Sequence, residues 1–573
     1  MLAAPNPHPA HRWPGFTLAA ALGAALTLGL FAGLRPAYAR PLADPLPVTS
    51  LVDSGPGTLR EALQNAVDGD TITFSLAPNS VIVVTSELTV TAAITIDGSA
   101  ATNLIVSGGG VTRVFSATAP LRLVSLSVTG GQVYGSGGGL YSTSAVTLTD
   151  VVFVGNVVTD GRGGGLYTQS ILSATASSFL TNTTTAITIT PGVSRGGGAY
   201  ADGGLYFTGG LILGNQTFGA AAAGGVGTDG DAVVSGTQFI RNTTNASAAA
   251  GGLRVGGAAL LTNVLFQENS SGALGGGLSV NGSAILSNVV FARNQAATDG
   301  GGARFGSPAT LLGVEFVSNE AGANGGGLFA GAGLTLSGTQ FLTNSAATDG
   351  GGLYAVGGLL VAEGGLLRAN TAGDDGGGLV AFSGAQLTAT QFISNSAAGD
   401  GGGLQLEGGD GRLVNLIVAR NTAGGVGAGL DLATSGEVTG LHLTVAAVAN
   451  PGAAIAVQAG SVTLTNTILV GHATGLSLLG GAAAEDYTLF YSTTVTATAG
   501  VSLGAHSFVG DPRFANAAAD DYHLGPASAA INAGADAGVP VDFEGEPRPF
   551  GPAPDLGADE AQTIRVFLPL VVR

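Results

Sequence analysis

The sequence predicts an all-β chain that folds as a parallel β-helix. One unit of about 25 residues recurs, with copies that begin at 291, 316, 341, 367 and 392. The copies read FARNQAATDGGGA, FVSNEAGANGGGL, FLTNSAATDGGGL, LRANTAGDDGGGL and FISNSAAGDGGGL. Each unit contains three short strand patterns separated by corners rich in glycine and serine. A fixed period of this length is typical of a stacked solenoid, because each unit completes its core only against its neighbours.

Equivalent residues of successive coils should lie above one another, about 4.8 Å apart. We therefore expect two inward apolar columns and a corner column of asparagines whose amides bond along the axis. The first apolar column contains Phe266, Phe291, Phe316, Phe341 and Phe392, with Leu367 in the remaining coil. The second contains Leu278, Leu328, Leu353, Leu379 and Leu404. The asparagine column contains Asn269, Asn294, Asn319, Asn344, Asn370, Asn395 and Asn421.

The composition supports an ordered chain and excludes some partners. Glycine accounts for 98 of 573 residues, charged residues for only 10% and hydrophobic residues for 45%, a balance unlike that of disordered chains. The formal net charge is -18 and every basic residue is Arg. An acidic chain without a basic stripe lacks the surface that nucleic acids require. There is no cysteine, so disulfides play no part in stability.

The N-terminus has the pattern of an export signal. His11 and Arg12 precede an uncharged apolar run from residue 15 to 34, and an AxA exit ends at Ala39. We interpret residues 1–39 as a signal peptide and residues 40–49 as a Pro-rich linker. The alternative is an uncleaved N-terminal anchor, because 20 apolar residues are just long enough to span a bilayer. Both interpretations place the protein outside the cytoplasm, secreted or at the cell envelope.

Residues 50–110 should form an N-terminal cap and the first coils. Thr58 and Glu61 stand at capping-box spacing and begin an amphipathic helix that we expect to end at Asp68. Its apolar face should contain Leu59, Ala62, Leu63, Ala66 and Val67. Strand patterns follow at 71–74, 81–84, 88–90 and 94–96. A solenoid exposes an open core at each end, so an apolar-faced helix before the first coil indicates a cap.

The repeats extend from 111 to 501, with looser copies at both ends. The interval from Phe179 to Phe239 holds two coils and surplus residues, which we place in a loop at 218–231. Such an insertion is either a binding loop or a flexible Ala/Gly loop. A rise in Pro, Asp and Glu predicts a C-terminal cap at 502–562, and residues 563–573 form an apolar tail.

Three groups of motifs resemble known bacterial families. The FxxN and GGG[LA] pairs resemble the repeats of the chlamydial polymorphic outer membrane proteins. The segment DSGPGTLREAL…GDTITF is similar to the start of bacterial surface β-helix proteins, and DPRF to DLGADE is similar to the end of choice-of-anchor β-helix proteins. The resemblance implies a right-handed, pectin-lyase-like parallel β-helix that is exported and displayed, and adhesion is the best-known role of the polymorphic group. Membrane association would then come only through an N-terminal anchor or a sorting tail.

One column of the repeat has no evident structural purpose. Asp349, Asp375 and Asp400 occupy the position before the glycine triplet in successive coils. Like charges about 4.8 Å apart repel by roughly 3.5 kcal/mol at an effective dielectric of 20, and a calcium ion would relieve the repulsion. The alternative is that Asp and Asn favour the turn before Gly, as Asn324 does at this position. No other cofactor is indicated.

Other charged residues leave two interpretations open. Arg162 and Arg195 occupy the same column in earlier coils, near Asp160 and Asp202, and form either a small polyanion-binding spot or solvated corners. The histidines His442, His472, His506 and His523 show no spacing to a nucleophile, so we assign them structural roles.

Two functional hypotheses follow. The first is a non-enzymatic surface or secreted protein that binds an extracellular polysaccharide or a surface protein along one face. The second is a polysaccharide lyase or glycoside hydrolase that uses acids on a lateral face of the helix. The fold alone cannot decide between them.

Overall fold

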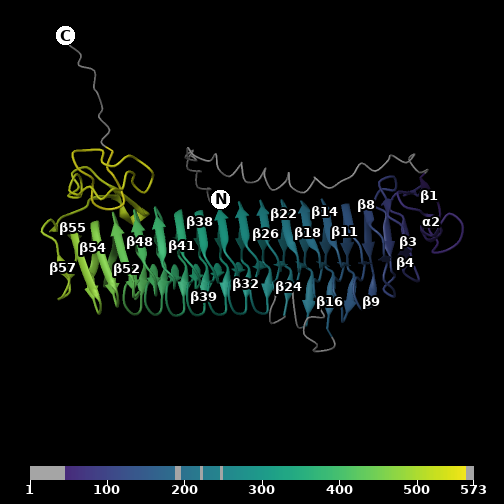
Figure 1. The fold of residues 1–573 in the computed structure, drawn as a ribbon, viewed down its shortest axis with the longest axis horizontal. Helices are drawn as coiled ribbons and strands as arrows, with labels where there is room; N and C mark the ends of the chain where they lie inside the picture. The colour runs from purple at the N-terminus through teal and green to yellow at the C-terminus, as the bar shows by residue number, and fades with distance from the viewer. Residues whose placement is uncertain (1–44, 187–194, 220–222, 246–249, 563–573) are drawn as a thin grey trace, which may run out of the picture. The chain divides into compact units, whose positions relative to one another are not determined.

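The computed structural model describes residues 45–186, 195–219, 223–245 and 250–562, except for the side chains of 448–451. The predicted signal peptide, the first linker residues and the apolar tail lie outside the described residues. The unit that begins at Pro45 is a parallel β-solenoid (Figure 1). It has about 17 turns, and 2% of the described residues are helical. The all-β class and the parallel β-helix are therefore confirmed.

Each regular coil contributes strands to four parallel ladders, which we number 1 to 4. Ladders 1 to 3 belong to a 46-stranded sheet, and ladder 4 is a separate sheet of 12 strands. Ladder 1 follows the glycine triplets and contains β4 (Leu88–Val90), β7 (Phe115–Ala117), β10 (Leu140–Ser142), β13 (Leu166–Thr168), β17 (Ala199–Ala201), β21 (Val226–Thr228), β25 (Leu253–Val255), β29 (Leu278–Val280), β33 (Ala303–Phe305), β37 (Leu328–Ala330), β40 (Leu353–Ala355), β43 (Leu379–Ala381), β47 (Leu404–Leu406), β51 (Leu430–Leu432) and β56 (Val495–Ala497).

Ladders 2 and 3 come next along each coil. Ladder 2 contains β1 (Leu46–Val48), β2 (Thr71–Phe74), β5 (Ile94–Asp97), β14 (Ile171–Thr175), β18 (Gly204–Thr208), β22 (Asp231–Ser235), β26 (Ala259–Thr262), β30 (Ala284–Ser287), β34 (Ala309–Leu312), β44 (Ala385–Thr388), β48 (Gly411–Val414), β52 (Glu437–Leu441) and β57 (Ser502–Leu503). Ladder 3 contains β3 (Val81–Val83), β6 (Ile105–Ser107), β15 (Ser178–Leu180), β19 (Leu211–Leu213), β23 (Gln238–Ile240), β27 (Leu265–Gln267), β31 (Val290–Ala292), β35 (Glu315–Val317), β45 (Gln391–Ile393), β49 (Ile417–Ala419) and β58 (Phe508–Val509).

Some strands are long enough to serve two or more ladders. They are β8 (Leu121–Thr129), β11 (Val146–Val154), β38 (Leu334–Leu342), β41 (Leu360–Arg368), β53 (Thr444–Val457), β54 (Ser461–Leu478) and β55 (Ala482–Tyr491). Ladder 4 contains β9 (Gln132–Tyr134), β12 (Val157–Thr159), β16 (Thr183–Thr185), β20 (Gln216–Phe218), β24 (Thr243–Thr244), β28 (Ser270–Ser271), β32 (Gln295–Ala296), β36 (Glu320–Ala321), β39 (Ser345–Ala346), β42 (Thr371–Ala372), β46 (Ser396–Ala397) and β50 (Thr422–Ala423).

The three predicted core columns are confirmed. Successive rings from Phe266 to Phe341 stack with centroids 4.8 to 4.9 Å apart, and the leucine column is fully buried. Asn344 shows the corner bonding, because its Nδ2 donates to Asn370 Oδ1 at 3.0 Å and to the backbone oxygen of Phe316 at 2.9 Å. The column also continues through the earlier residues Asn156, Asn182, Asn215 and Asn242.

The capping helix forms but is shorter than predicted. Helix α2 spans Leu59–Asn65, and Thr58 Oγ1 accepts a hydrogen bond from the backbone N–H of Glu61. Leu59, Ala62 and Leu63 are buried, whereas Val67 is 52% exposed. The helix ends early because Ala66 is extended and the carboxylate of Asp70 captures the N–H of Val67. The predicted end at Asp68 and the inward placement of Val67 were therefore wrong.

The surplus residues lie earlier than predicted. Leu166 pairs with Ala199, a step of 33 residues, whereas Ala199 pairs with Val226, a step of 27. The larger insertion therefore falls between β16 and β17, where residues 187–194 lie outside the described part. Within 218–231, β20 ends at Phe218, β21 spans Val226–Thr228 and β22 begins at Asp231. The coil that contains this segment has the smaller surplus, so the predicted position of the insertion was wrong.

The C-terminal region packs along the side of the last coils. The short strands β59 (Phe514–Asn516) and β60 (Asp521–Leu524) flank the 3-10 turn η1 (Ala517–Ala519). Leu524, Ala530 and Leu556 bury Ile468 and Leu489 of ladder 3. Asn466 Nδ2 donates to the backbone oxygen of Ala535 at 2.7 Å. Strands β57 and β58 pair with β55, so the last coil extends to Val509.

Candidate functional site

One lateral side of the coils carries many of the aromatic and charged side chains that lie outside the apolar core. We call it the post-triplet face: the outward residue of each ladder 1 strand, the residue before each glycine triplet and the residue after each strand. The outward residues from β10 to β51 are Tyr141, Tyr167, Tyr200, Gly227, Arg254, Ser279, Arg304, Phe329, Tyr354, Val380, Gln405 and Asp431. The parallel register places them in one row along the axis.

The first part of the face is a row of tyrosines paired with arginines and aspartates. The hydroxyl of Tyr167 donates to Asp202 at 2.7 Å, and Arg162 forms an ion pair with the same carboxylate at 3.0 Å. The guanidinium of Arg162 also lies 5.7 Å from the Tyr167 ring centroid. Burial, followed by the hydrogen bond to Asp202, raises the pKa of Tyr167 to about 12. The phenol therefore remains a hydrogen-bond donor at neutral pH.

The next tyrosine repeats this arrangement. The hydroxyl of Tyr200 donates to Asp229 at 2.6 Å, and both Arg195 and Arg254 form ion pairs with that carboxylate. Because Arg162 and Arg195 are both paired, they contribute little unpaired positive charge for the polyanion that the sequence suggested. Asp160 instead accepts a hydrogen bond from Tyr134.

A second aromatic group lies farther along the face. The ring centroids of Phe329 and Tyr354 are 5.6 Å apart, and those of Tyr354 and Phe382 are 5.3 Å apart. All three side chains are half-buried, so ring surface remains open to solvent. Burial, together with the charges of Asp349 and Glu407, raises the pKa of Tyr354 to about 12. Aromatic and carboxylate groups are thus interleaved on one surface.

The predicted aspartate column is present and is built into the coil corners. Asp349 Oδ1 accepts the backbone N–H of Asp375 at 3.1 Å, and Asp375 Oδ1 accepts that of Asp400 at 2.6 Å. Asn324 takes part in the same way, as an acceptor for Asp349. This bonding matches the turn interpretation of the column. Among the residues that the structure describes, no group of three or more His, Asp or Glu side chains is arranged to hold a metal ion, and calcium binding stays a prediction.

An acid–amide cluster extends this column toward the last coils. Gln405 Nε2 lies 3.3 Å from both Asp375 Oδ2 and Asp431 Oδ2, and Gln458 Nε2 donates to Asp400 at 3.2 Å and to Asp431 at 2.9 Å. Asp431 is fully buried, and burial with the charges of Asp400 and Asp375 raises its pKa to about 6. Three carboxylates therefore share two amide donors, and the pKa of one carboxylate is raised, as in groups that act as general acids.

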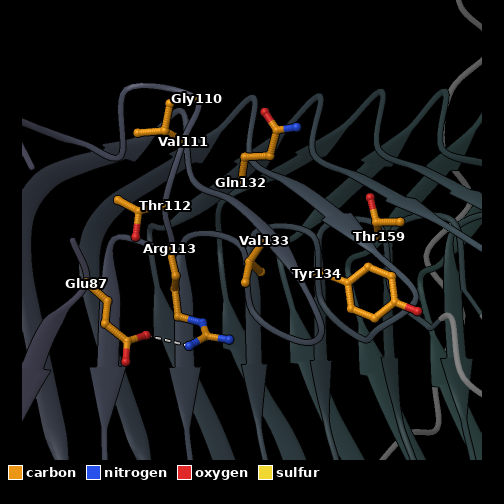
Figure 2. Close-up of a pocket in the computed structure, with 9 residues that line it drawn as sticks. All are labelled: Glu87, Gly110, Val111, Thr112, Arg113, Gln132, Val133, Tyr134 and Thr159. Atoms are coloured by element: carbon orange, nitrogen blue, oxygen red, sulfur yellow. Dashed lines mark hydrogen bonds and ion pairs between the residues drawn. The ribbon is translucent and has the colours of Figure 1, made fainter. Parts of the chain in front are cut away.

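A pocket of about 460 Å³ is lined in part by Tyr134 (Figure 2). Its walls include Val111, Arg113, Gln132 and Tyr134. The guanidinium of Arg113 donates to Glu87 at 2.5 Å and lies 5.2 Å from the Tyr141 ring centroid, which joins the pocket to the post-triplet face. The sequence showed no sign of this pocket, because none of these residues recurs with the repeat.

The four histidines of the described region are placed separately. His442 and His472 are buried, and burial lowers their pKa values to about 3 and about 4. His506 stacks on Tyr487, with ring centroids 4.3 Å apart. Burial alone would lower the pKa of His523, but hydrogen bonds to Glu544 and Asp521 raise it to about 9. The four histidines therefore lie in four separate environments.

Sequence reasoning missed the outward row of ladder 1, although a signal was present. The residue after GGGL or GGGA is tyrosine at 141, 167, 200 and 354. A period of one coil at an outward strand position predicts a row of side chains outside the core, just as an inward period predicts a core column. In this row Tyr167 and Tyr200 are themselves buried by their neighbours.

No known protein family matches the chain, and no curated protein has a matching sequence. The resemblance to chlamydial and choice-of-anchor proteins therefore rests on short motifs alone. Within the described ranges, no helix has the length and apolar character needed to span a membrane. The chain can therefore be classed as a parallel β-helix repeat protein.

Proposed function

We propose that this chain is an exported β-helix protein, secreted or held at the cell surface, that binds an extracellular polysaccharide along the post-triplet face without chemically altering it. The observation that carries the proposal is the row of half-buried rings, Phe329, Tyr354 and Phe382, beside the carboxylates of the aspartate column. Coils repeat about every 4.8 Å, so a polymer with its own repeat can contact many coils at once.

The chemistry of the face supports a sugar polymer over other ligands. Ring faces offer apolar area for the C–H faces of sugars, and carboxylate and amide groups accept and donate hydrogen bonds to hydroxyls. The net charge of -18 opposes a polyanion such as a nucleic acid. A surface protein as the partner is an outcome that the test below distinguishes.

The test is retention of the full chain on immobilised neutral polysaccharides, measured by affinity electrophoresis. Replacing Phe329 and Tyr354 with alanine should weaken retention by about tenfold, because stacking area is lost from the middle of the face. The matched control is Tyr206→Ala, since Tyr206 is 37% exposed on ladder 2 and away from the face. Equal loss in both variants, or retention on none of the polysaccharides, would contradict the proposal.

A second candidate is a polysaccharide lyase or glycoside hydrolase centred on Asp375, Asp400 and Asp431. The shared amides of Gln405 and Gln458 favour it, because they hold carboxylates within roughly 6 Å of one another, near the separations used in glycoside hydrolysis. Assays for reducing ends and for unsaturated products decide the matter. Product formed by the wild type and lost in Asp400→Asn would replace the first proposal with this one.

A further inference from the structure

The pocket of Figure 2 exists because ladder 4 begins there. Strand β9 is the first member of the 12-stranded sheet, and the preceding coil has only the turn at 108–113 in its place. Val158, the residue that pairs with Val133 in the next coil, is fully buried, whereas Val133 remains partly exposed as the pocket floor. The hollow is thus a single feature of the first regular coil and is not repeated along the stack.

The walls combine exposed apolar surface with free hydrogen-bonding groups. Val111 and Tyr134 are each 72% exposed, among the most exposed large apolar side chains of the described residues, and they line different sides of the hollow (Figure 2). The side chains of Gln132, Thr112 and Thr159 also line it, and none has a hydrogen-bond partner within the described residues. The site therefore offers a ring face and several unused donors and acceptors.

The walls are held in place before any ligand arrives. The hydroxyl of Tyr134 donates to Asp160 at 2.9 Å, and this hydrogen bond raises the pKa of Tyr134. Arg113 is fixed by Glu87, by the backbone oxygen of Gly137 at 3.0 Å and by that of Ser136 at 3.0 Å. Little side-chain entropy then remains to be lost on binding, which favours affinity from a small contact area.

The charges of the pocket lining determine which class of ligand it can bind. Among the described residues that line the pocket, Glu87 and Arg113 are the only charged ones, and they neutralise each other in an ion pair. An anionic or cationic ligand would find no unpaired counter-charge in the lining. A volume of about 460 Å³ lies within the range of roughly 300 to 1,000 Å³ that is typical of small-molecule sites.

We propose that this pocket binds a neutral sugar unit, with one sugar face against the Tyr134 ring and its hydroxyls bonded to Gln132, Thr112 and Thr159. The proposal rests on the proposed function and deepens it, because Arg113 connects the pocket to Tyr141 at the start of the post-triplet face. A polysaccharide lying on that face would place one of its units here.

A single-tryptophan reporter tests the site. The chain has one tryptophan, Trp13, so Trp13→Phe combined with Tyr134→Trp gives an emission signal from the pocket alone. Titration with neutral tetraoses of glucose, xylose and mannose should shift that emission saturably for at least one of them, at millimolar concentration. Adding Gln132→Ala and Thr159→Val should weaken the response by about tenfold. The control reporter, Trp13→Phe with Tyr206→Trp, should not respond.

The outcomes separate this inference from the proposed function. If the chain is retained on polysaccharide but the emission of the tryptophan at position 134 does not change, the pocket proposal is wrong and the proposed function stands. An emission shift with tetraoses but no retention on any polysaccharide overturns the proposed function and supports the pocket. If neither retention nor an emission change is observed, both proposals are wrong. A stronger emission response to oligogalacturonate than to neutral sugars would contradict the assignment of a neutral ligand.

Discussion

The amide of Gln458 closes over the carboxylate of Asp431, with Nε2 3.0 Å from Oδ1 and 2.9 Å from Oδ2. Gln405 donates to the same carboxylate, whose side chain has no exposed surface. An acid in this position is satisfied by hydrogen bonds and still costs free energy when it ionises, because burial and the nearby Asp400 oppose its charge.

That cost predicts a pH-dependent stability. The pKa of Asp431 rises from 3.8 to about 6 on folding, so the folded state binds the proton more tightly and the free energy of unfolding falls as pH rises between these values. Asp431→Asn keeps the group neutral but places an amide nitrogen against one of the glutamine donors, so it loses a hydrogen bond at every pH. The stability of the variant relative to the wild type should therefore rise by about 2 to 3 kcal/mol between pH 4 and pH 8. Melting temperatures of both proteins across this range measure it. A difference between the two proteins that stays the same at all pH values would contradict the prediction.

The asparagine column predicts a large local penalty. Asn344→Ala removes two donated hydrogen bonds and leaves the backbone N–H and the side-chain amide of Asn319 without their acceptor. We expect a loss of about 2 to 4 kcal/mol in the free energy of unfolding, measured by urea denaturation. Ser345→Ala, at the adjacent exposed position, should change it by less than about 0.5 kcal/mol. Similar losses in both variants would show that the ladder is not the source.

The aspartate column should tolerate the replacement of one of its aspartates by asparagine. Asp375→Asn retains an oxygen that accepts the N–H of Asp400, as Asn324 does for Asp349. It gives up the 3.3 Å contact with Gln405, and we expect the removed charge repulsion to offset that loss. The variant should therefore melt at or above the wild-type temperature in the absence of calcium. The same melts test the calcium prediction for Asp349, Asp375 and Asp400. Binding requires a rise in melting temperature with millimolar calcium that Asp375→Asn abolishes.

The C-terminal region should depend on one buried arginine. Arg548 contacts the ring of His442, donates to the backbone oxygen of Ala558 at 2.9 Å and lies 3.7 Å from Glu560. Arg548→Met leaves the buried Glu560 without its counter-charge, so residues 514–561 should detach before the coils unfold, at a cost of roughly 3 to 5 kcal/mol. Limited proteolysis detects this as early cleavage in that segment. Arg122→Met on ladder 2, which lies far from the C-terminal region, should leave the cleavage pattern unchanged.

The sequence by itself determined the solenoid, its inward columns, its asparagine ladder and the capping helix. Residues such as Asn344 and Asn370 are neighbours in space because they are one coil apart in the chain, so their contact appears as a period in the sequence. The tyrosine row of ladder 1 carried the same kind of signal and could have been predicted from it.

Only the tertiary structure decided the features that do not repeat. The insertion lies in the coil between Leu166 and Ala199, which contains the extra residues while these two residues remain paired. The docking of the C-terminal region depends on contacts such as Asn415 with Val541, which are 126 residues apart. The pocket depends on the turn at 108–113, which stands where the later coils have a ladder 4 strand. These contacts occur once each, so no periodicity records them, and packing in three dimensions sets where they form.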